Sequence, residues 1–176
     1  MKLTSTYRKL TKNTTINDET LLSTDYLNHF NELVMMLEMV PDMPEMLAEA
    51  EAWVPKTYQE HFRDSNFQHK ELAVWAYEQA PDKYRVPLDD CIERMDTEIA
   101  ERLTELRVLV DGEQAAVLQE TVATTAGLLR RRIDTMSALI NGAMDAEAYE
   151  AEMAAEGPTD HGGSVMGQSD IDALFD

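Results

Sequence analysis

The chain has 176 residues, and its 34 Asp and Glu side chains against 15 Lys and Arg give a formal net charge of −19. A surface this acidic repels phosphate backbones, which excludes a nucleic-acid-binding face spread over the whole fold. Hydrophobic residues make up 44% of the sequence, which is enough for one folded domain with a single core. We therefore expect no nucleic acid among its partners.

Two further features predict a cytoplasmic protein. Cys91 is the single cysteine, so we expect neither an internal disulfide nor a thiolate metal cluster, as is usual in a reducing compartment. No apolar run approaches the ~18 residues that a membrane span needs, and the first residues lack the apolar stretch of a signal peptide. We predict cytoplasmic localisation and no membrane insertion.

Charge divides the chain into two parts. Every Lys and Arg lies between Lys2 and Arg132, whereas residues 133–176 carry 10 acidic residues and neither basic type. The acidic part also contains Gly, Pro and Ser, a composition typical of a flexible, disordered linker. We predict four regions: a polar N-terminal arm (1–24), a helical domain (25–143), an acidic flexible linker (144–165) and a C-terminal partner-binding peptide (166–176).

Apolar residues in the body recur mostly at three- and four-residue spacing, which predicts an all-α fold without strands. Capping residues and prolines divide the first half into short helices, because the residue before a proline is disfavoured in helical geometry. The predicted helices are 25–40, 43–53, 56–63 and 67–79, the last with Leu72, Trp75 and Ala76 on its packed face.

The strongest periodic pattern lies in residues 89–143, after an expected break at Val86-Pro87. Two long runs of helical spacing flank the turn sequence Val110-Asp111-Gly112-Glu113, so we predict an antiparallel helical hairpin at the centre of a helical bundle. Helices of about 20 to 30 residues are long for a small body to cover. Two arrangements stay open: a homodimer through the hairpin, or cover by aromatic residues of the first half, namely Phe30, Trp53, Phe62, Trp75 and Tyr77.

Residues 166–176 have the pattern of a short amphipathic helix. Ser169 and Asp172 form a start that resembles a capping box, and Asp170 lies beside them near the positive end of the helix dipole. Such a short helix is not stable alone, so we expect it to fold into a groove of another protein, with docking on its own bundle as the alternative. Its apolar face consists of Ile171, Leu174 and Phe175.

The sequence Gln168-Ser169-Asp170-Ile171-Asp172-Ala173-Leu174-Phe175 resembles the Ser-Gln-x-x-Ile-Asp-x-Leu-Leu peptide that opens the flagellar motor switch protein FliM. It resembles more loosely the peptide that closes the chemotaxis phosphatase CheZ. Both peptides bind the phosphorylated response regulator CheY, so the resemblance implies an adaptor or regulator in chemotaxis or flagellar signalling. It further implies that the apolar face fills the regulator's groove, that the aspartates meet a basic rim and that the serine caps the helix. The match covers residues 168–175, and Ser-Gln is inverted here to Gln168-Ser169.

A phosphatase of that regulator is the alternative function. CheZ-like phosphatases use an Asp-x-x-x-Gln pair whose amide orients the attacking water, and Asp64 and Gln68 have this spacing. We expect the two side chains one helical turn apart on a common face. However, the hairpin has no such motif, and Ser65 to Gln68 also reads as a capping box for the 67–79 helix, which favours a non-catalytic role. A third possibility is a structural helical protein whose tail binds an unrelated partner.

Other candidate chemistry is weakly supported. His61 and His69 lack a recognised metal-ligand spacing and are expected at the surface, and no Gly-rich phosphate loop is present. We therefore predict no metal and no cofactor. His29 is expected to be a half-buried packing residue, and the basic cluster Arg130-Arg131-Arg132 is expected to pair with acids on a neighbouring helix.

Overall fold

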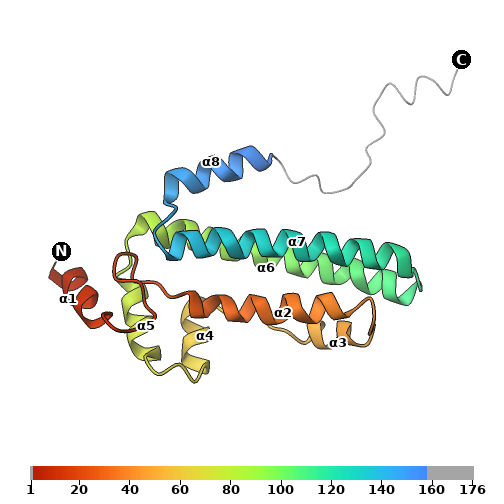
Figure 1. The fold of residues 1–176 in the computed structure, drawn as a ribbon, viewed down its shortest axis with the longest axis horizontal. Coiled ribbons are helices and arrows are strands. Elements are labelled where there is room, and N and C mark those ends of the chain that lie inside the picture. Colours follow the sequence, from red (N-terminus) through yellow and green to blue (C-terminus); the bar gives the residue numbers. More distant parts are fainter. Residues whose placement is uncertain (1, 158–176) are drawn as a thin grey trace, which may run out of the picture.

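The computed structural model describes residues 2–157, which form eight α-helices and one 3₁₀ helix (Figure 1). The all-α prediction is confirmed: within this range the only β feature is an isolated bridge between Ile16 and Ser23. At the centre, α6 (Asp82–Asp111) and α7 (Ala115–Ile140) run antiparallel and pack against each other along their lengths. In the same range, no helix is both long and apolar enough to cross a membrane.

The first hairpin helix begins earlier than its sequence pattern predicts. The break expected at Val86-Pro87 is wrong, because α6 begins at Asp82 and continues through Pro87. A proline in the second turn of a helix removes one backbone hydrogen bond, and here Pro87 and Leu88 are both buried. At the other end, Gly112 caps α6 before a short turn into α7, close to the predicted turn.

The first half of the chain covers one side of the hairpin. Helix α2 (Asn28–Met39) packs on α7, and α3 (Met46–Glu51) packs on α2 and α6. Phe30, Phe62 and Tyr77 are buried as predicted, but Trp75 is 55% exposed. The prediction for Trp75 is wrong because α5 (Lys70–Glu78) buries the face opposite Trp75, through Ala73, Val74 and Tyr77 together with Ala76, whose burial is confirmed. The homodimer stays a prediction.

The boundary drawn at residue 24 is also wrong. Besides α1 (Lys2–Leu10), the region contains Ile16, Leu21 and Leu22, whose side chains belong to the main core. The hydroxyl of Thr20 donates a hydrogen bond of 2.5 Å to the carbonyl of Ile140, at the end of α7. Residues 16–23 therefore belong to the helical body and lead into the 3₁₀ helix η1 (Thr24–Leu27).

A second correction concerns the predicted linker at 144–165. Its first part forms α8 (Ala146–Glu156), where Asp145 caps the helix by accepting a hydrogen bond from the backbone nitrogen of Ala148. Figure 1 shows α8 beside the hairpin, on the side away from α2. The remaining linker residues from 158 onward lie outside the part of the chain that the structure describes.

Candidate functional site

The predicted partner-binding residues lie outside the described residues: Ser169, Asp170, Ile171, Asp172, Leu174 and Phe175. The structure does describe the helix that precedes them, α8, and the contacts that hold α8 on the hairpin. Arg132 on α7 is only 3% exposed and donates hydrogen bonds to Glu98 on α6 (2.8 Å) and to Glu156 at the end of α8 (2.7 Å). The bond to Glu98, followed by that to Glu156, raises the pKa of Arg132, so its charge is retained.

Two further hydrogen bonds fix α8 on the hairpin. The hydroxyl of Thr135 donates to Glu152 (2.6 Å), and that of the buried Tyr149 donates to Asp90 (2.7 Å). Burial, the hydrogen bond to Asp90 and nearby charge raise the pKa of Tyr149, so the phenol stays protonated and donates. With Arg132, these contacts connect α8 to both hairpin helices from Tyr149 to Glu156. The segment from residue 157 onward therefore starts from a defined position.

Asp64 and Gln68 do not share a helix face, so that prediction is wrong. Asp64 is the last residue of α4 (Tyr58–Asp64), and Gln68 lies in the turn before α5. The chain becomes extended at Ser65 (φ −83°, ψ 165°), whose hydroxyl accepts a hydrogen bond from the backbone nitrogen of Phe67 (3.2 Å). Such local side-chain bonds compete with helix continuation. Asp64 is exposed and forms an ion pair with Lys56 at 3.0 Å.

The capping box predicted at Ser65 is likewise absent, because α5 begins only at Lys70 and its N-cap His69 makes no side-chain cap bond. The capping box in this region belongs to α4 instead. Thr57 accepts from the backbone nitrogen of Glu60 (3.2 Å), and the Glu60 carboxylate accepts from that of Thr57 (2.9 Å). This box lies at the start of α4, whose buried Tyr58 packs on Tyr26 of η1.

Asp64 instead borders a small pocket between α2 and α4, with a volume of about 220 Å³. His29, 9% exposed, forms its inner wall and stacks on Trp53, with ring centroids 4.5 Å apart. The His61 ring lies 5.8 Å from that of His29, and its half-buried position among Tyr26 and Phe62 corrects the surface position expected for it. His29 packs against neighbouring rings as predicted, but it is buried rather than half-buried.

Both pocket histidines are neutral near pH 7. Burial, the charge of His61 and the charge of Lys56 lower the pKa of His29 to about 4. Burial also lowers the pKa of His61. The Nε2 atom of His29 is buried and has no hydrogen-bond partner. Across residues 2–157, no three His, Cys, Asp or Glu side chains are arranged to hold a metal ion.

A cavity of about 420 Å³ between α4 and α6 carries the most strongly perturbed carboxyl group of the described body. Burial, then the charge of Glu93, raises the pKa of Asp96 to about 6. Its Oδ1 atom is buried without a hydrogen-bond partner. In the same cavity the hydroxyl of Tyr77 donates a hydrogen bond to the carboxylate of Asp89, so these two polar groups are paired with each other.

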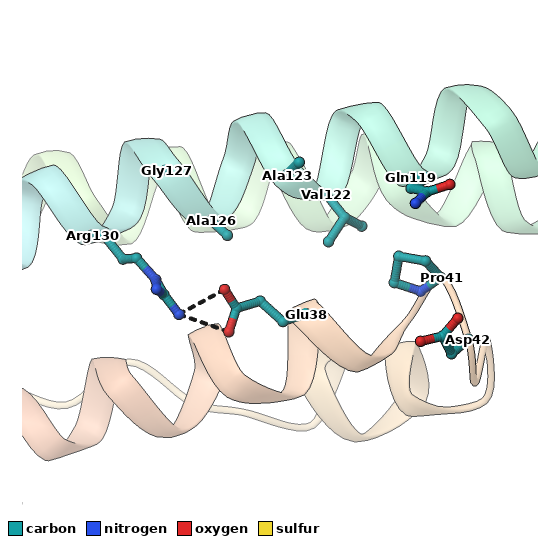
Figure 2. A pocket seen from close by; sticks show the side chains of 9 residues that line it. All are labelled: Glu38, Pro41, Asp42, Gln119, Val122, Ala123, Ala126, Gly127 and Arg130. Carbon is teal, nitrogen blue, oxygen red and sulfur yellow. Dashed lines mark hydrogen bonds and ion pairs between the residues drawn. The ribbon is translucent and has the colours of Figure 1, made fainter.

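A groove of about 500 Å³ runs between α2 and α7 and is shown in Figure 2; we call it the α2/α7 groove. Val122 and Ala126 of α7 form its buried floor, and Pro41 closes one side. At one end, Arg130 pairs with Glu38 at 2.6 Å. The other end carries Asp42 and Gln119, and the exposed Ala123 and Gly127 form the upper edge.

The expected pairing of the basic cluster is confirmed for two of its members. Arg130 reaches Glu38 on α2, and Arg132 reaches Glu98 and Glu156 on α6 and α8. One signal for the α8 anchor was available in the sequence. Tyr149, Glu152, Met153 and Glu156 recur at helical spacing, and that pattern was masked by the acidic composition around it.

Comparison of the chain with protein-family models, with curated proteins and with solved structures found no match.

Proposed function

We propose that the protein binds a CheY-like response regulator through residues 168–175 and acts as an adaptor or regulator in chemotaxis or flagellar signalling. The observation that carries the proposal is the sequence Gln168 to Phe175, which combines a capping serine, two aspartates and an apolar face at helical spacing. Peptides of this kind gain their structure from the groove that they enter. The regulator would supply the apolar groove and a basic rim.

The anchoring of α8 supports this role. Glu156 is held by Arg132, and Gly157 follows with φ +71°, a conformation that ends the helix. Residues 157–168 then separate the body from the peptide, and an extended chain of that length spans about 40 Å. A receiver domain could therefore bind the peptide without contacting the hairpin.

The test is a titration of the full chain against CheY-like receiver domains from the same source, with and without beryllofluoride as the phosphoryl mimic. We expect tighter binding to the activated domains. Phe175→Ala removes the largest apolar anchor, and truncating such an anchor typically costs about 2 kcal/mol, or roughly 30-fold in Kd. Met166→Ala, outside the matched residues, is the control and should bind like the wild type. Full affinity of Phe175→Ala would refute the proposal.

The same samples separate an adaptor from a phosphatase. An adaptor leaves the dephosphorylation rate of the regulator unchanged. A phosphatase working through Asp64 and Gln68 would raise that rate and lose the effect in Gln68→Ala. The positions of these residues, one paired with Lys56 and the other in a separate turn, favour the adaptor.

A further inference from the structure

The α2/α7 groove contains a glycine, Gly127, that the packing of the described residues does not require. Gly127 lies in the interior of α7, where glycine costs about 1 kcal/mol relative to alanine. A Cβ atom at this position would meet nothing within 4 Å, so no neighbour in the described body requires the glycine. Its small size, next to Ala123 and Ala126, leaves room for another chain segment to approach closely.

We propose that the α2/α7 groove is the docking site of this chain's own C-terminal peptide, residues 169–176. The peptide would lie over Gly127 with its apolar face on Val122 and Ala126. The carboxylate of Asp176 would reach the arginine end of the groove. The docked and the partner-bound peptide would then be mutually exclusive.

The position of the anchor makes this contact reachable. Glu156 is bonded to Arg132, which lies two residues from Arg130 on the same helix. From Arg130 to Gln119 the groove follows α7 for about 16 Å at 1.5 Å per residue. Residues 157–168 span up to about 40 Å, enough to pass around α7 and reach either end. A helix of residues 169–176 would be about 12 Å long and would fit the groove.

The chemistry of the groove favours this occupant at one end. Ile171, Leu174 and Phe175 would cover the buried floor residues and Pro41. Arg130 keeps its side chain 56% exposed although it pairs with Glu38, so its guanidinium has donors left for Asp176. Arg131 is exposed beside it. Because Asp42 lies at the opposite end, we expect the peptide's Asp176 end to lie at Arg130.

Paramagnetic relaxation in the full chain tests the contact. A nitroxide is attached to Gly167→Cys; Cys91 is buried, and its burial raises its thiol pKa to about 12, so the label reacts at residue 167. We expect the amide signals of residues 119–130 to lose more than half of their intensity. The blocking variant is Gly127→Glu, which fits the open space above the helix and repels the acidic peptide. Thr124→Glu adds the same charge on an exposed α7 position outside the groove and is the matched control.

The proposal predicts broadening that disappears in Gly127→Glu and persists in Thr124→Glu. Absence of broadening in the groove, or broadening that survives Gly127→Glu, would overturn it. Mixing a nitroxide-labelled chain with an isotopically labelled chain that lacks the nitroxide detects contacts between copies. Broadening of the groove signals in this mixture would also overturn the proposal, because the occupant would be a second copy.

The docking contact does not depend on the proposed function. Only the expected effect of docking on receiver binding rests on that function. If the docked form holds nine-tenths of the molecules, Gly127→Glu should bind the activated receiver domain about 10-fold more tightly. Docking without any receiver binding would refute the proposed function and leave the contact. Receiver binding without docking would refute the contact and leave the function.

Discussion

The buried His29 makes the stability of the fold depend on pH in a direction that can be calculated. Its pKa falls from an ordinary value of 6.5 to about 4, chiefly because the ring is buried against Trp53. The folded state therefore prefers the neutral imidazole. The stabilising effect of that neutrality is fully present above pH 6.5 and is lost as the pH falls from there towards 4.

The expected magnitude follows from linkage. A pKa change of this size corresponds to about 3 kcal/mol once the pH is below both values. At pH 5 the unfolded chain holds the proton and the folded chain mostly does not, which gives roughly 2 kcal/mol of destabilisation relative to pH 7. His29→Phe removes the titration and keeps a ring on Trp53. It also removes a hydrogen bond to the backbone of Val54, a residue that is 64% exposed.

Urea unfolding of the wild type and of His29→Phe at pH 7.0 and pH 5.0, followed by circular dichroism, measures the effect. Comparing the two proteins at each pH cancels the titration of all other groups that the substitution leaves unchanged. We expect the variant to gain roughly 2 kcal/mol on the wild type between the two pH values. A stability difference that is the same at both pH values would refute the reasoning.

Three further changes test other parts of the structure. Asp96→Asn should stabilise the fold by about 1 to 2 kcal/mol at pH 7.5. That gain should fade as the pH falls from the folded-state pKa of about 6 towards 3.8, measured by urea unfolding at several pH values. Arg132→Met leaves the carboxylates of Glu98 and Glu156 without their partner and should cost about 3 to 5 kcal/mol; hydrogen exchange should show α8 exposed first. Gly142→Ala forces alanine to φ +75° and should lower stability by about 1 kcal/mol, seen as a lower Tm.

Sequence periodicity predicted the hairpin because its signal extends over many turns. Ile92, Met95 and Ile99 repeat on one face of α6, and Leu129 and Met136 do so on α7. The same reasoning failed at short elements. Helical spacing with Leu72 and Ala76 predicts a packed Trp75, whereas the face that α5 buries is set by small residues that allow α4 to approach.

The positions of the candidate site residues could not be predicted from their spacing in the sequence. Asp64 and Gln68 have the separation of one helical turn, but the side chain of Ser65 bonds locally and ends the helix between them. His29 and His61 are distant in sequence and become neighbours only when α4 folds back on α2. A spacing rule assumes one continuous helix, and it fails wherever a single polar side chain competes with the backbone.

The charges on α8 show why an acidic segment is not necessarily a linker. Composition alone counts Glu152 and Glu156 as solvent-exposed charges, yet each accepts a hydrogen bond from α7, from Thr135 and Arg132 respectively. The guanidinium is buried and would be costly to leave unpaired, so the helix that neutralises it is held in place by that cost. The basic cluster in the second half of α7 therefore predicts an acidic partner, just as the acidic composition of residues 144–165 predicts exposure to solvent. The acidic residues of α8 and the arginines of α7 together therefore indicate that α8 packs on the body, whereas the acidic composition alone indicates a free linker.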